Sequence, residues 1–429
     1  MKTLTFKPGG LHLEGFKRKT ENLPIENMYD PPKVVIPLLQ HTGLPAVPNV
    51  KVGDHVKIGQ KIGDAQSDFS VPVHSSISGE VIAVNSYAIT IKNDNMSEWF
   101  MLNTESKNLY EKEELLKEIK ESGIVGLGGA CFPTHIKLNP PPDAKIDTLI
   151  INGAECEPYL TCDYRLMLEE GELIFDGIEI VEKILNPKNI YIGIEENKKN
   201  AIIKLRDLGN NRKSKVEIVA LKEKYPQGAE KQLIYAITGR KVPVGKLPFN
   251  VGVVVHNVGT IHAIAGAINL KKALIERVIT VSGDCISEPK NLRVKIGTTL
   301  EDVVNKCGGF TEEPSKIIFG GPMMGVTQST LDVPIVKGTS GVVFLKNIPL
   351  TEEGNCIRCG KCIVSCPSGL MPVRIMECSK NNEFDNAEKY FATSCIECGL
   401  CSYVCPSKIE ILSYIRNAKV EITKRRKRK

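Results

Sequence analysis

The sequence predicts a multidomain fold in which α/β and α+β domains follow one another along the chain. With 429 residues, the chain is too long for a single compact core, and three or four domains are expected. Residues 110–262 alternate strand and helix patterns with short connections, which is typical of a parallel, doubly wound sheet. Two cysteine runs near the C-terminus, at 356–366 and 395–405, indicate a further small domain organised around bound metal.

Residues 1–105 are expected to form an N-terminal domain of short strands. Residues 50–63 and 71–84 each give short alternating strands that glycine-containing turns interrupt. This pattern resembles half of the barrel-sandwich hybrid fold of lipoyl and biotinyl carriers. Such carriers present a lysine at the tip of a hairpin, whereas the corresponding stretch here is Ser67-Asp68-Phe69-Ser70. We therefore interpret the module as a structural interaction platform without a swinging arm.

Residues 106–275 are expected to form the α/β domain. Strands are predicted at 149–151, 190–194 and 216–221, and helices at 177–185 and 197–208. Asn197 is the expected cap of the second helix. Short strands, one helix and several glycine pairs then predict a small α+β module at 276–345.

The two cysteine runs share one spacing, in which two residues separate each of the first three cysteines and a Cys-Pro follows three residues later. The cysteines are Cys356, Cys359, Cys362 and Cys366 in the first run, and Cys395, Cys398, Cys401 and Cys405 in the second. In this bacterial ferredoxin pattern three thiolates hold one [4Fe-4S] cube and the fourth ligates the other cube. We predict two clusters within residues 346–415, with Cys405 completing the first set and Cys366 the second.

Other uses of these cysteines fit the pattern less well. Zinc sites usually take their ligands as two separated pairs, which leaves the repeated three-thiolate spacing unexplained. Disulfides need an oxidising compartment, which nothing in the sequence suggests. The remaining cysteines are expected to be buried thiols. They are Cys131, Cys156, Cys162, Cys285, Cys307 and Cys378.

Charge is concentrated at the C-terminus. The formal net charge is +6, and the last six residues, 424–429, are all basic, so the rest of the chain is neutral. Within the tail at 416–429, we expect these six residues to be disordered and able to contact anionic lipid or an acidic partner surface, with a merely solvated tail as the alternative. Nucleic acid binding is not expected, because no basic stripe interleaved with aromatic residues occurs elsewhere. Neither a membrane helix nor a signal peptide is predicted, so we expect a cytoplasmic protein.

Four segments of the α/β domain are candidates for a nucleotide site. The first is the glycine-rich loop at 126–137, where closely spaced glycines let backbone N–H groups turn toward an anion or a ring system. The second, at 152–158, directly follows a strand, and ligands bind beyond strand C-termini in open α/β sheets. The others are 225–231, before a helix, and 255–260, after an apolar run. Each segment alone is weak evidence for a nucleotide site, since surface acids, packed histidines and glycine-rich loops are common.

Together these segments resemble the flavin- and NADH-binding subunit of respiratory complex I, whose loops of the types GRGGAGFP, NxDExEP, GEE and NNV surround FMN. The order of barrel-sandwich module, flavin domain, β-grasp-like SLBB module and two-cluster ferredoxin domain is similar to the C subunit of the Rnf complex, a membrane ferredoxin:NAD oxidoreductase. The chain departs from the complex I pattern at Leu127, Cys131, Ala154 and His256, where that pattern has Arg, Gly, Asp and Asn.

The resemblance implies a set of binding residues. Gly126, Gly128 and Gly129 would line FMN, Lys137 and Asn152 would contact it, and Phe132 would stack on the nicotinamide or adenine ring of NAD(H). Glu155, Glu157 and Glu230, with Gly228 in the same loop as Glu230, would bind nucleotide hydroxyls, and Asn257 and Thr260 the phosphate end of FMN.

The resemblance also implies a function. Cubane clusters take single electrons, NADH delivers a hydride pair, and a flavin exchanges with both. We therefore expect a peripheral subunit on the cytoplasmic side of the cell membrane that exchanges electrons between NAD(H), FMN and two clusters within an ion-translocating Rnf-type complex. The alternatives are a soluble NADH-dependent cobalamin reductase and a flavin-free cluster scaffold.

Overall fold

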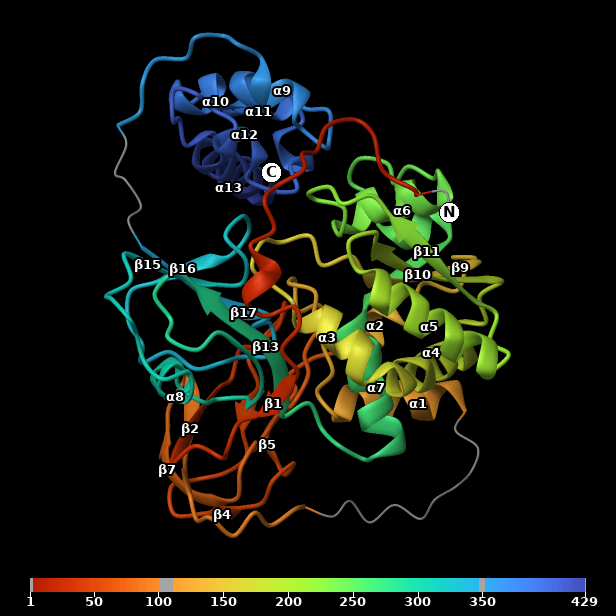
Figure 1. Cartoon of the computed structure of the whole chain (residues 1–429), viewed down its shortest axis with the longest axis vertical. Helices are drawn as coiled ribbons and strands as arrows, with labels where there is room; N and C mark the ends of the chain where they lie inside the picture. Colours follow the sequence, from red (N-terminus) through yellow and green to blue (C-terminus); the bar gives the residue numbers. More distant parts are fainter. Residues whose placement is uncertain (1–2, 101–110, 347–351, 429) are drawn as a thin grey trace.

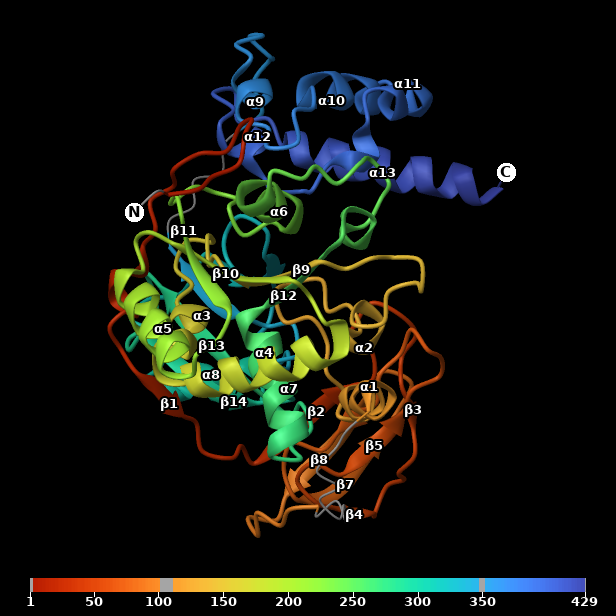
Figure 2. The ribbon, with the colours of Figure 1, turned by 90° about the vertical axis from the view of Figure 1, so that its right-hand side faces the viewer.

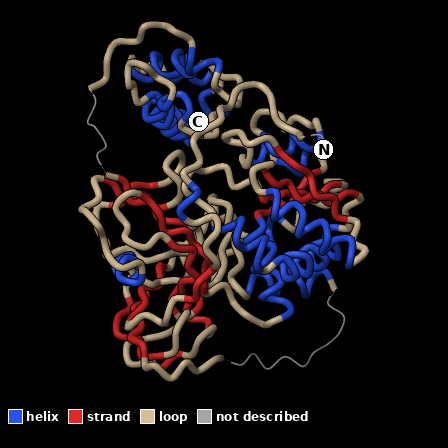
Figure 3. The backbone as a smooth tube through the Cα atoms, in the orientation of Figure 1, coloured by secondary structure: helices blue, strands red, loops and turns tan. Residues whose placement is uncertain are grey.

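The computed structural model describes residues 3–100, 111–346 and 352–428. Strands dominate the first part of the chain and the SLBB module, and helices dominate the α/β domain and the C-terminal part (Figures 1 and 3). The predicted boundary between residues 105 and 106 lies outside the described residues. The boundary between residues 345 and 346 lies next to residues 347–351, which are also outside them. The predicted domain limits therefore stay a prediction, whereas the fold classes are confirmed.

The barrel-sandwich module consists of two small antiparallel sheets. The first has the order β2 (Lys33–Pro37), β8 (Ala88–Asn93), β7 (Gly79–Val84), β4 (His55–Val56), and the second β3 (Val47–Pro48), β5 (Lys61–Asp64), β6 (Val73–His74). Val34 and Ile36 alternate with more exposed neighbours and are completely buried, as the period of two requires. The predicted hairpin tip at 67–70 is the loop between β5 and β6.

Residues 3–27 do not belong to these two sheets. Leu4 forms an isolated bridge with Leu221 and Leu11 one with Tyr225, so this segment runs along the α/β domain. Strand β1 (Ile25–Asn27) then pairs in parallel with β14 (Lys290–Lys295) of the SLBB module. Between Leu11 and β1, the short 3-10 helix η1 (Lys17–Lys19) lies against the loop that follows β9 (Thr148–Gly153). The N-terminal segment therefore connects two domains that are distant in sequence.

The α/β domain contains a four-stranded, fully parallel sheet. Its order is β11 (Val216–Leu221), β10 (Asn189–Glu195), β9 (Thr148–Gly153), β12 (Val253–Asn257). Figure 2 shows α4 (Gly171–Leu185), α5 (Lys199–Asn211) and α7 (Val258–Asn269) on one side of the sheet and α6 (Glu230–Thr238) on the other. Helices α1 (Lys112–Glu121), α2 (Thr134–Lys137), α3 (Cys162–Glu169) and η2 (Pro248–Val251) complete the domain. Helices on both faces confirm the predicted doubly wound architecture.

Two details of the predicted helices were wrong. Helix α4 begins at Gly171 and not at residue 177, because Ile174 and Phe175 extend its buried apolar face by more than a turn. Helix α5 begins at Lys199, with Lys198 and not Asn197 in the capping position. The Lys198 ammonium donates to the Glu195 carboxylate at 2.8 Å, and both side chains are almost completely buried.

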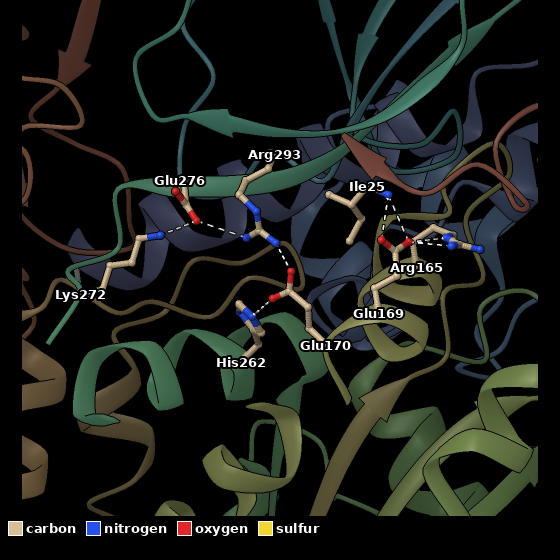
Figure 4. Close-up of polar contacts among 8 residues, drawn as sticks. All are labelled: Ile25, Arg165, Glu169, Glu170, His262, Lys272, Glu276 and Arg293. Carbon is tan, nitrogen blue, oxygen red and sulfur yellow. Dashed lines mark hydrogen bonds and ion pairs between the residues drawn. The ribbon is translucent and has the colours of Figure 1, made fainter. Parts of the chain in front are cut away.

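The SLBB module forms a mixed six-stranded sheet. Its order is β1, β14 (Lys290–Lys295), β13 (Glu276–Gly283), β17 (Gly341–Leu345), β15 (Lys316–Phe319), β16 (Val326–Gln328), and α8 (Leu300–Lys306) packs against it. Ion pairs tie this sheet to the α/β domain, as Figure 4 shows. Glu170 at the start of α4 pairs with both Arg293 of β14 and His262 of α7, and Arg293 also reaches Glu276 at 3.2 Å. A cavity of about 540 Å³ lies beside these residues.

The C-terminal domain is helical. Its elements are α9 (Lys361–Val364), α10 (Pro372–Lys380), α11 (Phe384–Lys389), η3 (Ala392–Ser394), α12 (Leu400–Tyr403) and α13 (Ile411–Arg428). The expectation of a disordered tail was wrong for the described residues, because α13 continues to Arg428. Ala418 and Ile422 of α13 are buried, and Arg425 pairs with Asp385 of α11 at 3.3 Å. Packing of α13 against α10 and α11 thus supports a helix through much of the tail at 416–429.

The cysteines outside the two runs are not all enclosed. Cys162, Cys285, Cys307 and Cys378 are buried, as predicted. The prediction was wrong for Cys131 and Cys156, which are only partly buried. Both lie in loops of the α/β domain and not in its helices or strands, so the core does not cover them completely.

Candidate nucleotide and cluster sites

The glycine-rich loop at 126–137 follows α1, includes α2 at its end and is held from two sides. The Gly126 N–H donates to the Phe132 carbonyl at 2.8 Å, which closes the loop, and the Leu127 N–H donates to the Thr260 hydroxyl at 2.9 Å. Gly128 packs against Asn257, since a Cβ at this position would lie 3.2 Å from the Asn257 Cβ. Gly129 has φ +125°, and a Cβ there would meet no described atom within 4 Å. The loop therefore presents backbone to open space next to the C-terminal end of β12.

The acidic loop, residues 152–158, begins with the last two residues of β9 and packs backbone to backbone against the loop before α6. The Asn152 side-chain amide donates to the Gly228 carbonyl at 2.8 Å, and its oxygen accepts from the Ala154 N–H at 3.1 Å. A Cβ on Gly228 would lie only 2.3 Å from the Ala154 carbonyl oxygen. Gly228 thus permits the close approach of two segments that are more than 70 residues apart.

Two carboxylates of the acidic loop each have one oxygen that is bonded and one that is buried without a partner. Glu155 Oε1 accepts from the Asp163 N–H at 2.9 Å, and Glu157 Oε2 from the Met323 N–H at 3.0 Å. Among the described residues, the other oxygen of each carboxylate has no hydrogen-bond partner. Burial raises the pKa of Glu157 to about 7. Buried acceptors without partners are uncommon, which makes these two oxygens candidates for hydrogen bonds to a bound nucleotide.

The structure also brings Lys137 and Glu230 together. The Lys137 ammonium lies 2.5 Å from Glu230 Oε1, and both side chains remain about one-third exposed. Lys137 is the last residue of α2, at the end of the glycine-rich loop, whereas Glu230 is the first residue of α6. Phe132, which precedes α2, is half-buried and lies edge-on to Phe69 of the barrel-sandwich module. Predicted residues of two segments, 126–137 and 225–231, therefore lie in one region, next to the barrel-sandwich module.

Asn257 and Thr260 lie next to the glycine-rich loop, but both side chains have protein partners. Asn257 caps α7 by accepting from the Gly259 N–H at 2.8 Å, and it donates to Asp163 at 2.7 Å. The Thr260 hydroxyl is buried and accepts from Leu127. In this arrangement their role is to shape the start of α7.

A residue that sequence reasoning missed, Lys17 of η1, supports the acidic loop from behind. Its ammonium donates to the carbonyls of Glu155 at 3.0 Å and Glu157 at 2.8 Å, and also to that of Leu160. Burial lowers the pKa of Lys17, although the neighbouring Glu155 opposes this shift. No local signal distinguishes Lys17 in the sequence, because its partners lie about 140 residues away.

These residues fit a flavin nucleotide in part. Open space beside Gly129, the unpaired oxygens of Glu155 and Glu157, and the partly exposed Lys137 are features that such a group would use. The side chains of Asn257 and Thr260 are already bonded, so an FMN phosphate near α7 would depend on backbone N–H groups.

The cysteines of the second run lie together with the last cysteine of the first run. Burial raises the pKa of the Cys398 and Cys401 thiols to about 12, and the nearby Cys366 and Cys395 contribute to both shifts. Burial also raises the pKa of Cys395, again with a contribution from Cys366. This proximity is the one that crossed ligation requires.

The first run is more open. Cys356 and Cys359 are exposed, and Cys356 is among the groups that act on the pKa of Cys362, which burial raises. Cys362 and Cys405 both pack against the apolar core of the C-terminal domain. Among the described residues no three His, Cys, Asp or Glu side chains are grouped as ligands of a single metal ion.

The second run lies directly against the α/β domain. The Tyr225 hydroxyl donates to the Cys398 carbonyl at 2.9 Å, and both groups are buried. The Gln232 amide of α6 donates to the Pro367 carbonyl at 3.3 Å. Tyr225 also lies close enough to Glu157 to contribute to its pKa. A short chain of contacts therefore runs from the acidic loop through Tyr225 to Cys398.

Four family models match the chain in order. They are the RnfC barrel sandwich hybrid domain at 4–106, the Nuo51 FMN-binding domain at 119–266, the SLBB domain at 278–327 and the 4Fe-4S dicluster domain at 355–409. The second of these includes the glycine-rich loop, the acidic loop and Asn257, and the fourth includes all eight cysteines of the two runs.

Curated relatives match almost the full chain. The C subunit of the proton-translocating ferredoxin:NAD(+) oxidoreductase complex of Clostridium ljungdahlii is 48% identical, over 96% of this chain and 93% of the relative. The C subunit of the Na(+)-translocating complex of Acetobacterium woodii is 44% identical, over 99% and 98%. The C subunit of the ion-translocating oxidoreductase complex of Rhodobacter capsulatus is 42% identical, over 86% and 73%.

A solved structure shares the fold at much lower identity. The NAD+-reducing NiFe hydrogenase in its air-oxidised state superposes with a TM-score of 0.52 at 17% identity, over 72% of this chain and 63% of the other. At this identity the likeness concerns the fold alone.

Proposed function

The chain belongs to the C-subunit family of Rnf-type, ion-translocating ferredoxin:NAD oxidoreductases, and on this premise we propose that it carries electrons between NAD(H) and its partner subunits through FMN and two [4Fe-4S] clusters. The observation that carries the proposal is the contact of the second cysteine run with the acidic loop through Tyr225. A cluster at this place would lie beside the flavin-binding region, as electron transfer requires.

The roles of the individual residues are part of the proposal. When bound, FMN supplies the exchange between a hydride pair and single electrons. Gly126, Gly128 and Gly129 would let backbone approach the flavin, and Lys137 would contribute positive charge. Glu155 and Glu157 would accept hydrogen bonds from nucleotide hydroxyls through their unpaired oxygens, and Asn152 and Gly228 would hold the acidic loop in position. Phe132 would stack on a base of NAD(H).

The cluster order follows from the same contacts. The cluster of Cys395, Cys398 and Cys401, completed by Cys366, would be the one next to the flavin, because Cys398 contacts Tyr225. The cluster of Cys356, Cys359 and Cys362, completed by Cys405, would be the outer one, since its loop is exposed. The outer cluster would then exchange electrons with a partner protein of the complex.

The alternatives receive less support. The relatives above are all named as C subunits of an oxidoreductase complex, and no observation favours a soluble cobalamin reductase. In a flavin-free scaffold, one buried carboxylate oxygen each of Glu155 and Glu157 would have no ligand donor to satisfy it.

We further propose a peripheral position on the cytoplasmic side of the membrane. Within the described ranges, no helix has the length and apolar character needed to cross a bilayer. Attachment would therefore depend on partner subunits, with the exposed basic residues of α13 as an additional contact.

Cofactor analysis of the anaerobically purified chain tests the proposal. We expect FMN in equal amount to the chain, and iron and sulfide sufficient for two cubes. Bleaching of the flavin by NADH should be followed by reduction of the clusters. Clusters without FMN would support the scaffold, and NADH-dependent reduction of a corrinoid would support the cobalamin reductase.

A further inference from the structure

Two loops of the barrel-sandwich module dock onto the glycine-rich loop of the α/β domain. The Thr42 hydroxyl donates to the Ala130 carbonyl at 2.8 Å, and the Thr42 N–H donates to the Cys131 carbonyl at 3.1 Å. At the other end of the loop, His135 Nε2 lies 2.8 Å from the Asp68 carbonyl oxygen. Since a carbonyl only accepts, His135 is the donor here. The hairpin tip at 67–70 therefore lies next to Phe132.

Contacts within the barrel-sandwich module hold this hairpin tip in place. A Cβ on Gly43, which has φ +144°, would lie 1.9 Å from the Phe69 carbonyl oxygen, so the two barrel loops are in backbone contact. The Ser70 hydroxyl donates to the Leu44 carbonyl at 3.0 Å, and the Val71 N–H donates to His41 at 3.2 Å. The backbone of Phe69 is thus held, although its side chain is not enclosed.

The Phe69 ring remains available to a ligand. It is 56% exposed, which is unusual for a phenylalanine, and it lies edge-on to Phe132 with ring centroids 6.4 Å apart and an interplanar angle of 74°. In an edge-to-face pair at least one ring keeps a face free. Two aromatic rings from different modules consequently meet beside the loop that presents open space at Gly129.

We propose that Phe69 is a specificity-determining residue of the nucleotide site, supplied by the barrel-sandwich module as a second aromatic wall for a planar base of NAD(H). The proposal rests on the function proposed above, in which Phe132 stacks on such a base. Aromatic stacking needs only a planar ring and an apolar face, both of which a nicotinamide or adenine ring provides. The position at which carriers have their modified lysine would then serve this chain as part of its own substrate site.

Matched substitutions on the holoprotein test the role. Phe69→Leu keeps an apolar side chain but removes the aromatic face, and we expect the KM for NADH to rise about fivefold to tenfold with kcat and FMN content unchanged. Phe69→Tyr keeps an aromatic ring at this position, so its KM for NADH should equal that of the unsubstituted protein. Tyr87→Ala removes an 81% exposed ring of the same module and should change nothing.

Equilibrium dialysis of NAD+ and of ADP-ribose gives a readout that is independent of turnover. Weaker binding of both ligands to Phe69→Leu assigns the adenine ring to Phe69, and weaker binding of NAD+ alone assigns the nicotinamide ring. Wild-type KM and wild-type binding in Phe69→Leu would overturn the inference. Absence of FMN or of NADH oxidation in the unsubstituted protein would instead overturn the proposed function.

Discussion

Substituting Gly228 by alanine should disrupt the flavin site without affecting the clusters. The added Cβ would lie 2.3 Å from the Ala154 carbonyl oxygen and 3.4 Å from the Cys156 sulfur. Because ordinary contacts of carbon atoms are about 3.5–4.0 Å, the acidic loop and the loop before α6 must separate by roughly 1 Å. Overpacking of this kind typically costs about 1–3 kcal/mol.

The same shift should weaken cofactor binding. It would stretch the bond from the Asn152 amide to the Gly228 carbonyl, now 2.8 Å long, and displace the unpaired oxygens of Glu155 and Glu157. If this strain of about 1–3 kcal/mol opposes cofactor binding, the Kd rises by roughly tenfold to 100-fold, because each difference of about 1.4 kcal/mol is tenfold in Kd. We therefore expect the Kd for FMN to rise about tenfold to 100-fold in Gly228→Ala.

Equilibrium dialysis of FMN against the cluster-loaded protein measures this effect, and low-temperature EPR verifies that both clusters remain. Gly266→Ala is the matched control, since a Cβ at this glycine within α7 meets no described atom within 4 Å. This change should leave the Kd unchanged and stabilise the helix by up to about 1 kcal/mol. A Gly228→Ala protein that binds FMN as tightly as the unsubstituted one would refute the reasoning.

Further predictions concern the clusters, the glycine-rich loop, the pH dependence and the tail. Cys366→Ala should give the EPR spectrum of Cys398→Ala if ligation is crossed, whereas the spectrum of Cys359→Ala would mean that each run closes its own cube. Gly129→Val should lose FMN and keep both clusters, because its φ of +125° strains any other residue and its side chain would occupy the open space. The pKa of Glu157, raised to about 7, lies above its ordinary value of 4.5, so this group stabilises the fold below about pH 4.5 and its contribution is lost as the pH rises to about 7. In thermal melts, the Tm of Glu157→Gln should therefore fall less than that of the unsubstituted protein between about pH 4.5 and pH 7. An equal fall of Tm with pH in both proteins would contradict the raised pKa of Glu157. Deleting 424–429 should lower the recovery of the complex at low ionic strength, and less so at high ionic strength, where salt screens these charges. NADH-to-dye activity should not change. Equal recovery of both proteins at low ionic strength would indicate a merely solvated tail.

The sequence alone was sufficient for the features that depend on short spacings. The two cysteine runs predicted the iron–sulfur domain, because a thiolate loop around a cube is only a few residues long. Alternating strands and helices predicted the doubly wound sheet, since the period of apolar residues reports which faces are buried. The glycine-rich and acidic loops were recognisable as motifs, each within one stretch of the chain.

Only the tertiary structure decided which distant segments meet. Lys17 is an ordinary lysine in the sequence, and its role under the acidic loop depends on partners about 140 residues away. Phe69 looked like part of a lost carrier tip until the fold brought it to Phe132, and the importance of Tyr225 emerged only when the fold brought it to Cys398. The basic tail looked disordered from its charge, but α10 and α11 provide an apolar surface and acidic partners for α13. The physical reason is common to these cases: burial and pairing depend on the packing of whole domains, whereas a sequence pattern reports only its own neighbourhood.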